Sequence, residues 1–137
     1  MKYPATFTAE GDRFVVTFRD IPEAITQGDD DADALFMAKD VLIASMEVYF
    51  DEKRPVPPPS APLAGDRLIA LPASIAVKVL LLNQMLEQNI IPSELARRMD
   101  TTRQEVNRLI DLKHTTRIDR IEDAMAALGR ELELSVA

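Results

Sequence analysis

The segment PVPPPSAP at residues 55–62 constrains the fold most strongly, because five of its eight residues are proline. Proline has no backbone N–H and fixes φ near −65°, so this stretch cannot be helical and takes an extended, polyproline-like conformation. At about 3.1 Å per residue it would span roughly 25 Å. We therefore expect a semi-rigid spacer between two modules, residues 1–66 and 67–137. The alternative is a proline-rich ligand for an adaptor domain.

The charges divide at the same place. Residues 1–66 hold six Lys and Arg against thirteen Asp and Glu, which accounts for the whole net charge of −7, whereas residues 67–137 hold ten of each. Within the second module, residues 93–120 carry seven basic and five acidic side chains. The total charge would argue against nucleic-acid binding. Its uneven distribution indicates two modules with different partners.

Several classes of protein are excluded by composition. The chain has no cysteine, one histidine and four glycines, so it lacks thiolate metal sites, disulfides and glycine-rich phosphate loops. His114 is the sole candidate general base, and we expect it to cap a helix or contact a phosphate. The N-terminal residues lack a secretory signal, and no apolar run is long enough to span a membrane. We expect a cytoplasmic protein with no catalytic site and no cofactor.

The residue pattern of the first module predicts three strands followed by a helix. Apolar residues alternate over 3–7 and 14–18 around a turn at 10–12, and a short third strand follows over 24–28. The acidic run Asp29–Asp31 precedes apolar residues at helical spacing, namely Leu35, Ala38, Leu42, Met46 and Tyr49. We expect these carboxylates to cap the helix. A divalent-cation site is the alternative, although the ligand spacing of an EF-hand loop is absent.

The residue pattern of the second module predicts a strand, several helices and a final strand. Residues 68–71 form a short apolar run that ends at Pro72, which suits the beginning of a helix. The apolar positions of this helix are Ile75, Val79, Leu82 and Leu86, flanked by Leu81 and Met85. After Gly129, which is expected to end the last helix, apolar and polar residues alternate over 131–136. This alternation predicts a C-terminal strand, whose exposed edge is a candidate dimer surface.

Residues 92–129 carry the pattern of a helix-turn-helix. A short helix begins at Pro92, and Thr102 with Glu105 forms a capping box that begins the next helix. Ala96 is small where the two helices must approach closely. The predicted buried positions are Leu95, Ala96 and Met99 on the first helix and Val106, Leu109 and Ile110 on the second. The turn position that is often glycine is Asp100, a residue that tolerates the left-handed conformation.

The second helix of this motif presents a polar face suited to bases. Arginine can donate two hydrogen bonds to guanine, and asparagine or glutamine can pair with adenine. We predict that the base-contacting residues are Arg103, Gln104, Asn107 and Arg108. Those expected to contact phosphates are Arg97, Lys113, Thr115, Thr116 and Arg117. The alternative is an ordinary helical packing unit with a solvated polar surface.

The segment FVVTFRDIPEAITQGDDDADAL, with MAKDVL behind it, resembles the HicB antitoxins of bacterial toxin-antitoxin pairs. The shared order is a strand, Asp-Ile-Pro, a short strand with Thr-x-Gly, and an acidic helix start. Many relatives have Gly-Cys after the proline, where this chain has Glu23 and Ala24. The resemblance extends over nearly the whole chain, including the proline-rich segment and the helix-turn-helix.

This resemblance implies an α+β fold, in which a partial ribonuclease-H-like β-β-β-α-β domain precedes a small helix-turn-helix domain. It implies that the first domain binds and blocks a small basic mRNA-cleaving toxin, HicA. It further implies that the second domain dimerises, binds operator DNA and represses its own operon. Two rivals stay open: a stand-alone helix-turn-helix regulator with a ligand-sensing N-terminal domain, and a metal-dependent nuclease using carboxylates such as Asp12, Asp20 and Glu23.

Overall fold

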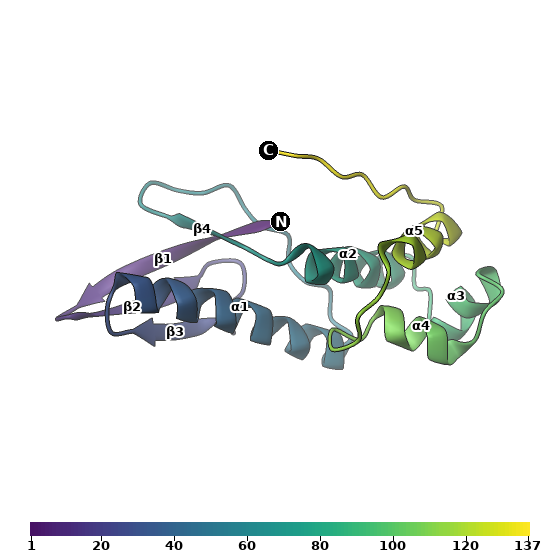
Figure 1. Cartoon of the computed structure of the whole chain (residues 1–137), viewed down its shortest axis with the longest axis horizontal. Coiled ribbons are helices and arrows are strands. Elements are labelled where there is room, and N and C mark those ends of the chain that lie inside the picture. Colours follow the sequence, from purple (N-terminus) through teal and green to yellow (C-terminus); the bar gives the residue numbers. More distant parts are fainter. The chain divides into compact units, whose positions relative to one another are not determined.

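The computed structural model describes all residues from Met1 to Ala137 (Figure 1). These residues form two compact units. Unit 1 comprises residues 1–49 and 56–73, and unit 2 comprises residues 50–55 and 74–137. The division therefore differs from a single boundary after residue 66. None of the helices combines the length and the apolar character needed to cross a membrane.

Unit 1 is built on a four-stranded antiparallel sheet in the order β3-β2-β1-β4. Its strands are β1 (Lys2–Glu10), β2 (Arg13–Phe18), β3 (Ile25–Gly28) and β4 (Arg67–Ala70). The predicted hairpin is confirmed, with Gly11 at φ +62° in its turn. Tyr3 of β1 pairs with Ile69 of β4. The strand after the proline-rich segment therefore completes the sheet of unit 1, and the α+β fold class is confirmed.

Helix α1 (Asp31–Glu52) follows β3 and covers one face of this sheet (Figure 1). Its first turn is capped as predicted, because Asp30 Oδ1 accepts a hydrogen bond from Asp33 N at 2.8 Å. Asp33 Oδ2 in turn accepts one from Asp29 N at 2.8 Å. The core between helix and sheet includes Tyr3, Ala5, Val16, Phe18, Ala34, Ala38, Leu42, Met46 and Tyr49. Leu35, which the spacing also assigned to this core, is only half-buried.

The proline-rich segment 55–62 forms no helix, as expected, but from Val56 onward it belongs to unit 1 and is not a spacer between the units. The Tyr3 hydroxyl donates a hydrogen bond to the Pro57 carbonyl at 2.7 Å. Asp20 Oδ2 accepts hydrogen bonds from the backbone N and the Oγ of Ser60, at 2.9 and 3.0 Å. Prolines have no backbone N–H to donate, and side chains of unit 1 supply a donor to the Pro57 carbonyl and an acceptor to Ser60. The segment therefore lies against unit 1 as a strap.

Unit 2 is helical, with α2 (Ala73–Glu87), α3 (Pro92–Arg98), α4 (Arg103–Leu109) and α5 (Ile118–Ala127). The predicted positions Val79 and Leu82 of α2 and the flanking Leu81 and Met85 are buried, whereas Ile75 and Leu86 are half-buried. The buried residues of α2 are Val77, Lys78, Val79, Leu81, Leu82 and Met85. The core-facing side of this helix is therefore rotated relative to the predicted one, and it includes a lysine.

The predicted C-terminal strand at 131–136 is absent. Gly129, at φ +71°, follows the end of α5 as expected, and the remaining residues form an extended tail without regular structure. Figure 1 shows this tail leaving α5. Leu134 is 76% and Val136 100% exposed. The alternating pattern failed because a strand needs a neighbouring strand for its backbone groups, and unit 2 of a single chain is composed of helices and connecting segments.

Candidate nucleic-acid interface

Helices α3 and α4, which cover the two helices expected from the sequence, pack together. Leu95 and Val106 are fully buried, and Ala96 is 4% exposed. A larger side chain at Ala96 would separate the helices, since protein cores are close-packed. Met99 is only half-buried, whereas Leu109 and Ile110 are buried as predicted.

The turn between these helices contains the predicted left-handed aspartate. Asp100 has φ +54°. Thr101 N donates to the Ala96 carbonyl at 2.9 Å, and Asp100 N donates to the Arg97 carbonyl at 3.2 Å. These two bonds close α3 with the pattern of a Schellman motif, which usually places glycine at the left-handed position. The turn therefore has the predicted tight geometry without glycine.

Thr102 caps α4, as the capping box predicts. Its Oγ1 accepts a hydrogen bond from Glu105 N at 3.2 Å. The Glu105 carboxylate forms an ion pair with Arg108 on the same helix. Because Thr102 is in an extended conformation, with φ −95° and ψ 155°, the direction of α4 is fixed from its first residue.

Three of the predicted base-contacting residues share an open polar surface. Arg103, Gln104 and Asn107 are exposed, and their side chains form no hydrogen bond or ion pair within the chain. Their donors and acceptors are therefore available to a ligand. Arg108 is also exposed, but its guanidinium is paired with the Glu105 carboxylate. Contact with a base would require Arg108 to leave this carboxylate.

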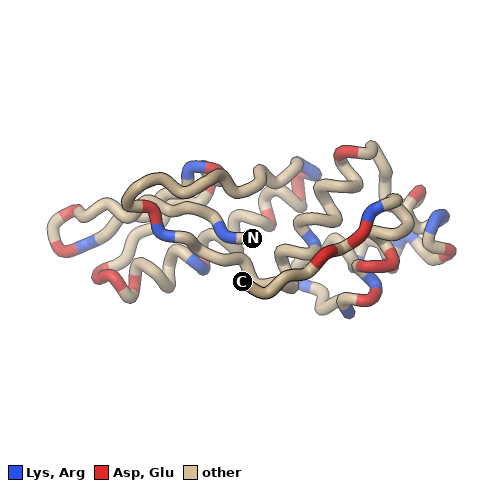
Figure 2. Tube along the Cα trace, turned by 90° about the horizontal axis from the view of Figure 1, so that it is seen from above, with Lys and Arg blue, Asp and Glu red and all other residues tan.

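Arg97, a predicted phosphate-contacting residue, is likewise paired within its helix. Its Nε and Nη2 donate to the two carboxylate oxygens of Glu94, at 3.0 and 2.6 Å. Hydrogen bonds from Arg97 and Arg98 lower the pKa of Glu94 to about 2. These pairs stand at i, i+3 and i, i+4 spacing, a signal visible in the sequence that our assignment of Arg97 did not weigh. Figure 2 shows the wider pattern, in which acidic and basic positions are interspersed along unit 2.

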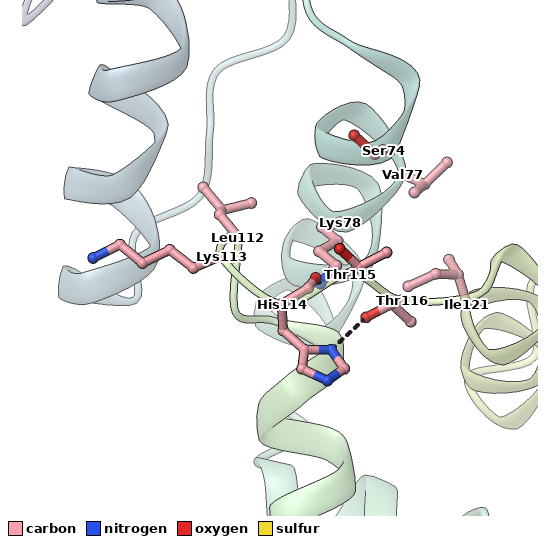
Figure 3. Close-up of a pocket in the computed structure, with 9 residues that line it drawn as sticks. All are labelled: Ser74, Val77, Lys78, Leu112, Lys113, His114, Thr115, Thr116 and Ile121. Carbon is pink, nitrogen blue, oxygen red and sulfur yellow. Dashed lines mark hydrogen bonds between the residues drawn. The ribbon is translucent and has the colours of Figure 1, made fainter.

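The other predicted phosphate-contacting residues lie on the segment between α4 and α5. Lys113, Thr115 and Arg117 are exposed, and Thr116 is half-buried. Thr116 Oγ1 lies 3.2 Å from Nδ1 of His114 (Figure 3). This segment borders a pocket of about 180 Å³ whose lining also includes residues of α2.

Lys78 of α2 lines this pocket beside the candidate site, and the sequence analysis missed it. Its side chain is 3% exposed, and its Nζ donates to three backbone carbonyls, those of Arg108, Asp111 and His114. Burial lowers the pKa of Lys78. The available signal was a lysine within the apolar run AVKVLLL, where a charged residue needs buried partners.

Several of the acidic side chains considered for metal chemistry have structural partners in unit 1. Asp20 binds Ser60, and the Tyr49 hydroxyl donates to Glu23 Oε2 at 2.6 Å. Asp30 caps α1. No three His, Asp or Glu side chains of the chain come together in an arrangement that could hold a metal ion.

Comparison with known proteins gives consistent matches. Residues 2–80 match a family described as the HicB_like antitoxin of bacterial toxin-antitoxin system. The chain is 46% identical over 134 residues to Antitoxin HicB 2 of Photorhabdus laumondii, covering 98% of this chain and 95% of the relative. It is 45% identical over 135 residues to Antitoxin HicB of Escherichia coli K12, covering 98% of each. It is 38% identical over 118 residues to Antitoxin HicB of Pseudomonas fluorescens, covering 85% and 81%.

Proposed function

Because this chain belongs to the HicB-like antitoxin family, we propose that it neutralises a HicA-type mRNA-cleaving toxin and represses its own operon. Unit 1 binds the toxin, and α3 and α4 of unit 2 bind operator DNA. The chain acts in the cytoplasm as a binding protein rather than an enzyme. Its partners are a toxin, a DNA duplex and a second copy of the chain.

The polar surface of α4 carries the DNA-binding part of the proposal. Arg103, Gln104 and Asn107 are exposed and unbonded, while Val106 on the same helix is fully buried. A helix held in this way by a preceding helix and a tight turn fits the major groove of B-form DNA. Arginine distinguishes guanine there, and asparagine or glutamine distinguishes adenine, because these side chains match the hydrogen-bond patterns of the base edges.

The DNA proposal is tested with the full chain and a duplex from the promoter upstream of its gene. Arg103→Ala and Gln104→Ala should each cost about 1–3 kcal/mol in binding and relax base preference, whereas Arg117→Ala should weaken binding to all sequences about equally. Fluorescence anisotropy with the promoter duplex and a scrambled duplex measures both effects. Equal behaviour of the three variants would show that the base-contacting surface is misassigned.

The charge of the first 66 residues supports toxin binding. Their balance of −7 suits a basic protein, because opposite potentials accelerate encounter and favour correct orientation. Co-expression with the neighbouring open reading frame tests this partner. We expect a stable complex and relief of growth inhibition. If no basic protein is bound and a small ligand instead shifts DNA affinity, the chain is a stand-alone regulator.

A homodimer follows from the way helix-turn-helix proteins use DNA, since paired recognition helices meet major grooves about 34 Å apart. The tail supports this proposal, because the apolar side chains of Leu134 and Val136 are largely exposed in a single chain. Sedimentation of the full chain and of a variant lacking residues 131–137 tests it. A dimer that persists in the shortened variant would show that the contact lies elsewhere, and a monomeric full chain would refute the dimer itself.

A further inference from the structure

Lys78 connects α2 to the end of α4. Its Nζ lies 3.1 Å from the Arg108 carbonyl, 2.7 Å from the Asp111 carbonyl and 2.5 Å from the His114 carbonyl. An ammonium group has three donors and no acceptor, so these three carbonyls use its full hydrogen-bonding capacity. The side chain is buried. The Lys78 ammonium group therefore binds three backbone carbonyls that lie up to six residues apart in the sequence.

The arrangement has a clear electrostatic basis. The last carbonyls of a helix have no donor within the helix, and the partial negative charge of the helix dipole accumulates there. Lys78 supplies both a positive charge and donors at the end of α4. Charge-assisted hydrogen bonds of this kind are about twice as strong as neutral ones. They offset the cost of burying the ammonium group.

The hydrogen bonds from Lys78 constrain the backbone of segment 111–117, because two of the three carbonyls, those of Asp111 and His114, belong to it. This segment is also fixed by contact between His114 and Thr116, and Thr116 Oγ1 lies 3.5 Å from the Arg108 carbonyl. Figure 3 shows the backbone of the segment beside Lys78, with the side chain of Lys113 directed away from it. Lys78 of α2 is thus buried beside the segment, while Lys113 on the segment itself is exposed.

We propose that Lys78 is a positioning residue for DNA binding, which holds segment 111–117 so that Lys113, Thr115 and Arg117 meet the phosphate backbone. This inference rests on the proposed operator binding. The positioning role differs from a general stabilising role because Lys78 binds only the last turn of α4 and the segment that follows it. Arg103 and Gln104 lie on the first turn, which Thr102 fixes independently.

The proposal predicts a specific binding signature. Loss of Lys78 should weaken binding to specific and scrambled DNA by the same factor, because phosphate contacts carry no sequence information. It should also reduce the slope of log K against log salt concentration by about 1 for each lost phosphate contact. Reduced stability alone lowers the fraction of folded protein and leaves this slope unchanged.

The experiment compares full-length Lys78→Met and Lys78→Gln with Lys39→Met, which removes the same charge from an exposed position on α1. Anisotropy titrations use the promoter duplex and a scrambled duplex at several salt concentrations, and circular dichroism reports folding. We expect Lys78→Met to lower both affinities about tenfold and to flatten the slope. Lys78→Gln should recover part of the affinity, since its amide can still donate to two carbonyls. Lys39→Met should resemble the wild type.

Each other outcome is decisive. If the wild type binds the promoter duplex but Lys78→Met has the wild-type slope, or if base discrimination is lost with affinity, the positioning role is refuted while operator binding stands. If both Lys78 variants fail to fold, Lys78 is a stability residue and the positioning role is likewise refuted. If the wild type itself does not bind the promoter duplex, the proposed function fails first.

Discussion

Replacing Gly28 by alanine tests the close approach of β3 to α1. A Cβ at Gly28 would lie 2.3 Å from the backbone N, 2.4 Å from the Cα and 2.8 Å from the Cβ of Ala34. Ordinary van der Waals contacts of a Cβ begin at 3.4 Å, so the added methyl would overlap the first turn of α1 by about 1 Å. The nearest atoms are backbone, and no change of rotamer removes the overlap.

The expected loss of stability depends on how far the backbone of α1 must shift to make room for the methyl group. Overpacking a well-packed site typically costs about 1–3 kcal/mol. Here the movement that relieves the overlap also displaces the first turn of α1, where the cap by Asp30 is worth about 1 kcal/mol. We therefore expect Gly28→Ala to lower the free energy of unfolding of unit 1 by about 3 kcal/mol, at the upper end of the overpacking range.

Tyrosine fluorescence during urea denaturation provides a selective assay. The chain has no tryptophan, and its two tyrosines both belong to unit 1. Gly11→Ala is the matched control, because Gly11 has φ +62° but open space around it, and the left-handed conformation costs an alanine about 1–2 kcal/mol. The double variant Gly28→Ala/Ala34→Gly should not recover stability. A smaller cost than that of Gly11→Ala, or recovery in the double variant, would refute the argument.

Three further predictions concern single interactions. Asp100→Gly should stabilise unit 2 by about 1 kcal/mol in thermal denaturation, since glycine adopts the left-handed conformation without strain; a lower melting temperature would contradict this. Glu94 should titrate at a pKa of about 2 by NMR, below its ordinary 4.5, and higher in Arg97→Ala. The stabilising effect of ionised Glu94 is therefore complete above pH 4.5 and disappears as the pH falls through its folded-state pKa of about 2. An unchanged Glu94 titration in Arg97→Ala would show that the pair is absent in solution. Tyr3→Phe should cost about 1 kcal/mol by losing its hydrogen bond to Pro57, and absorbance titration of the wild type should place the pKa of this buried phenol at about 12.

Features set by neighbouring residues could be predicted from the sequence. Thr102 caps α4, and Asp30 caps α1, because a cap requires only a side chain and backbone groups within one helical turn. The burial of Val106 and Leu109 follows from helical periodicity in the same way. The ion pair of Glu105 with Arg108 is equally local, and it could have been anticipated from its i, i+3 spacing.

Features set by distant residues could not be predicted. Pro57 receives its hydrogen bond from Tyr3, 54 residues earlier in the chain, and Lys78 binds carbonyls 30 to 36 residues later. No pattern along the sequence identifies which distant group satisfies a proline-rich backbone or a buried ammonium. The predicted strand at 131–136 was wrong for the same reason, since alternation shows that a strand could form but not whether a neighbour is present.

The strap and β4 limit how this protein can be dissected into recombinant fragments. A truncation at residue 66 would remove an edge strand and leave β1 with unpaired backbone groups open to aggregation. A fragment that starts at residue 67 would carry that strand with no sheet to join. Since residues 50–55 belong to unit 2 and residues 56–73 to unit 1, no single cut separates the two units. Exchanging one unit between relatives therefore requires replacing two separate stretches of the sequence.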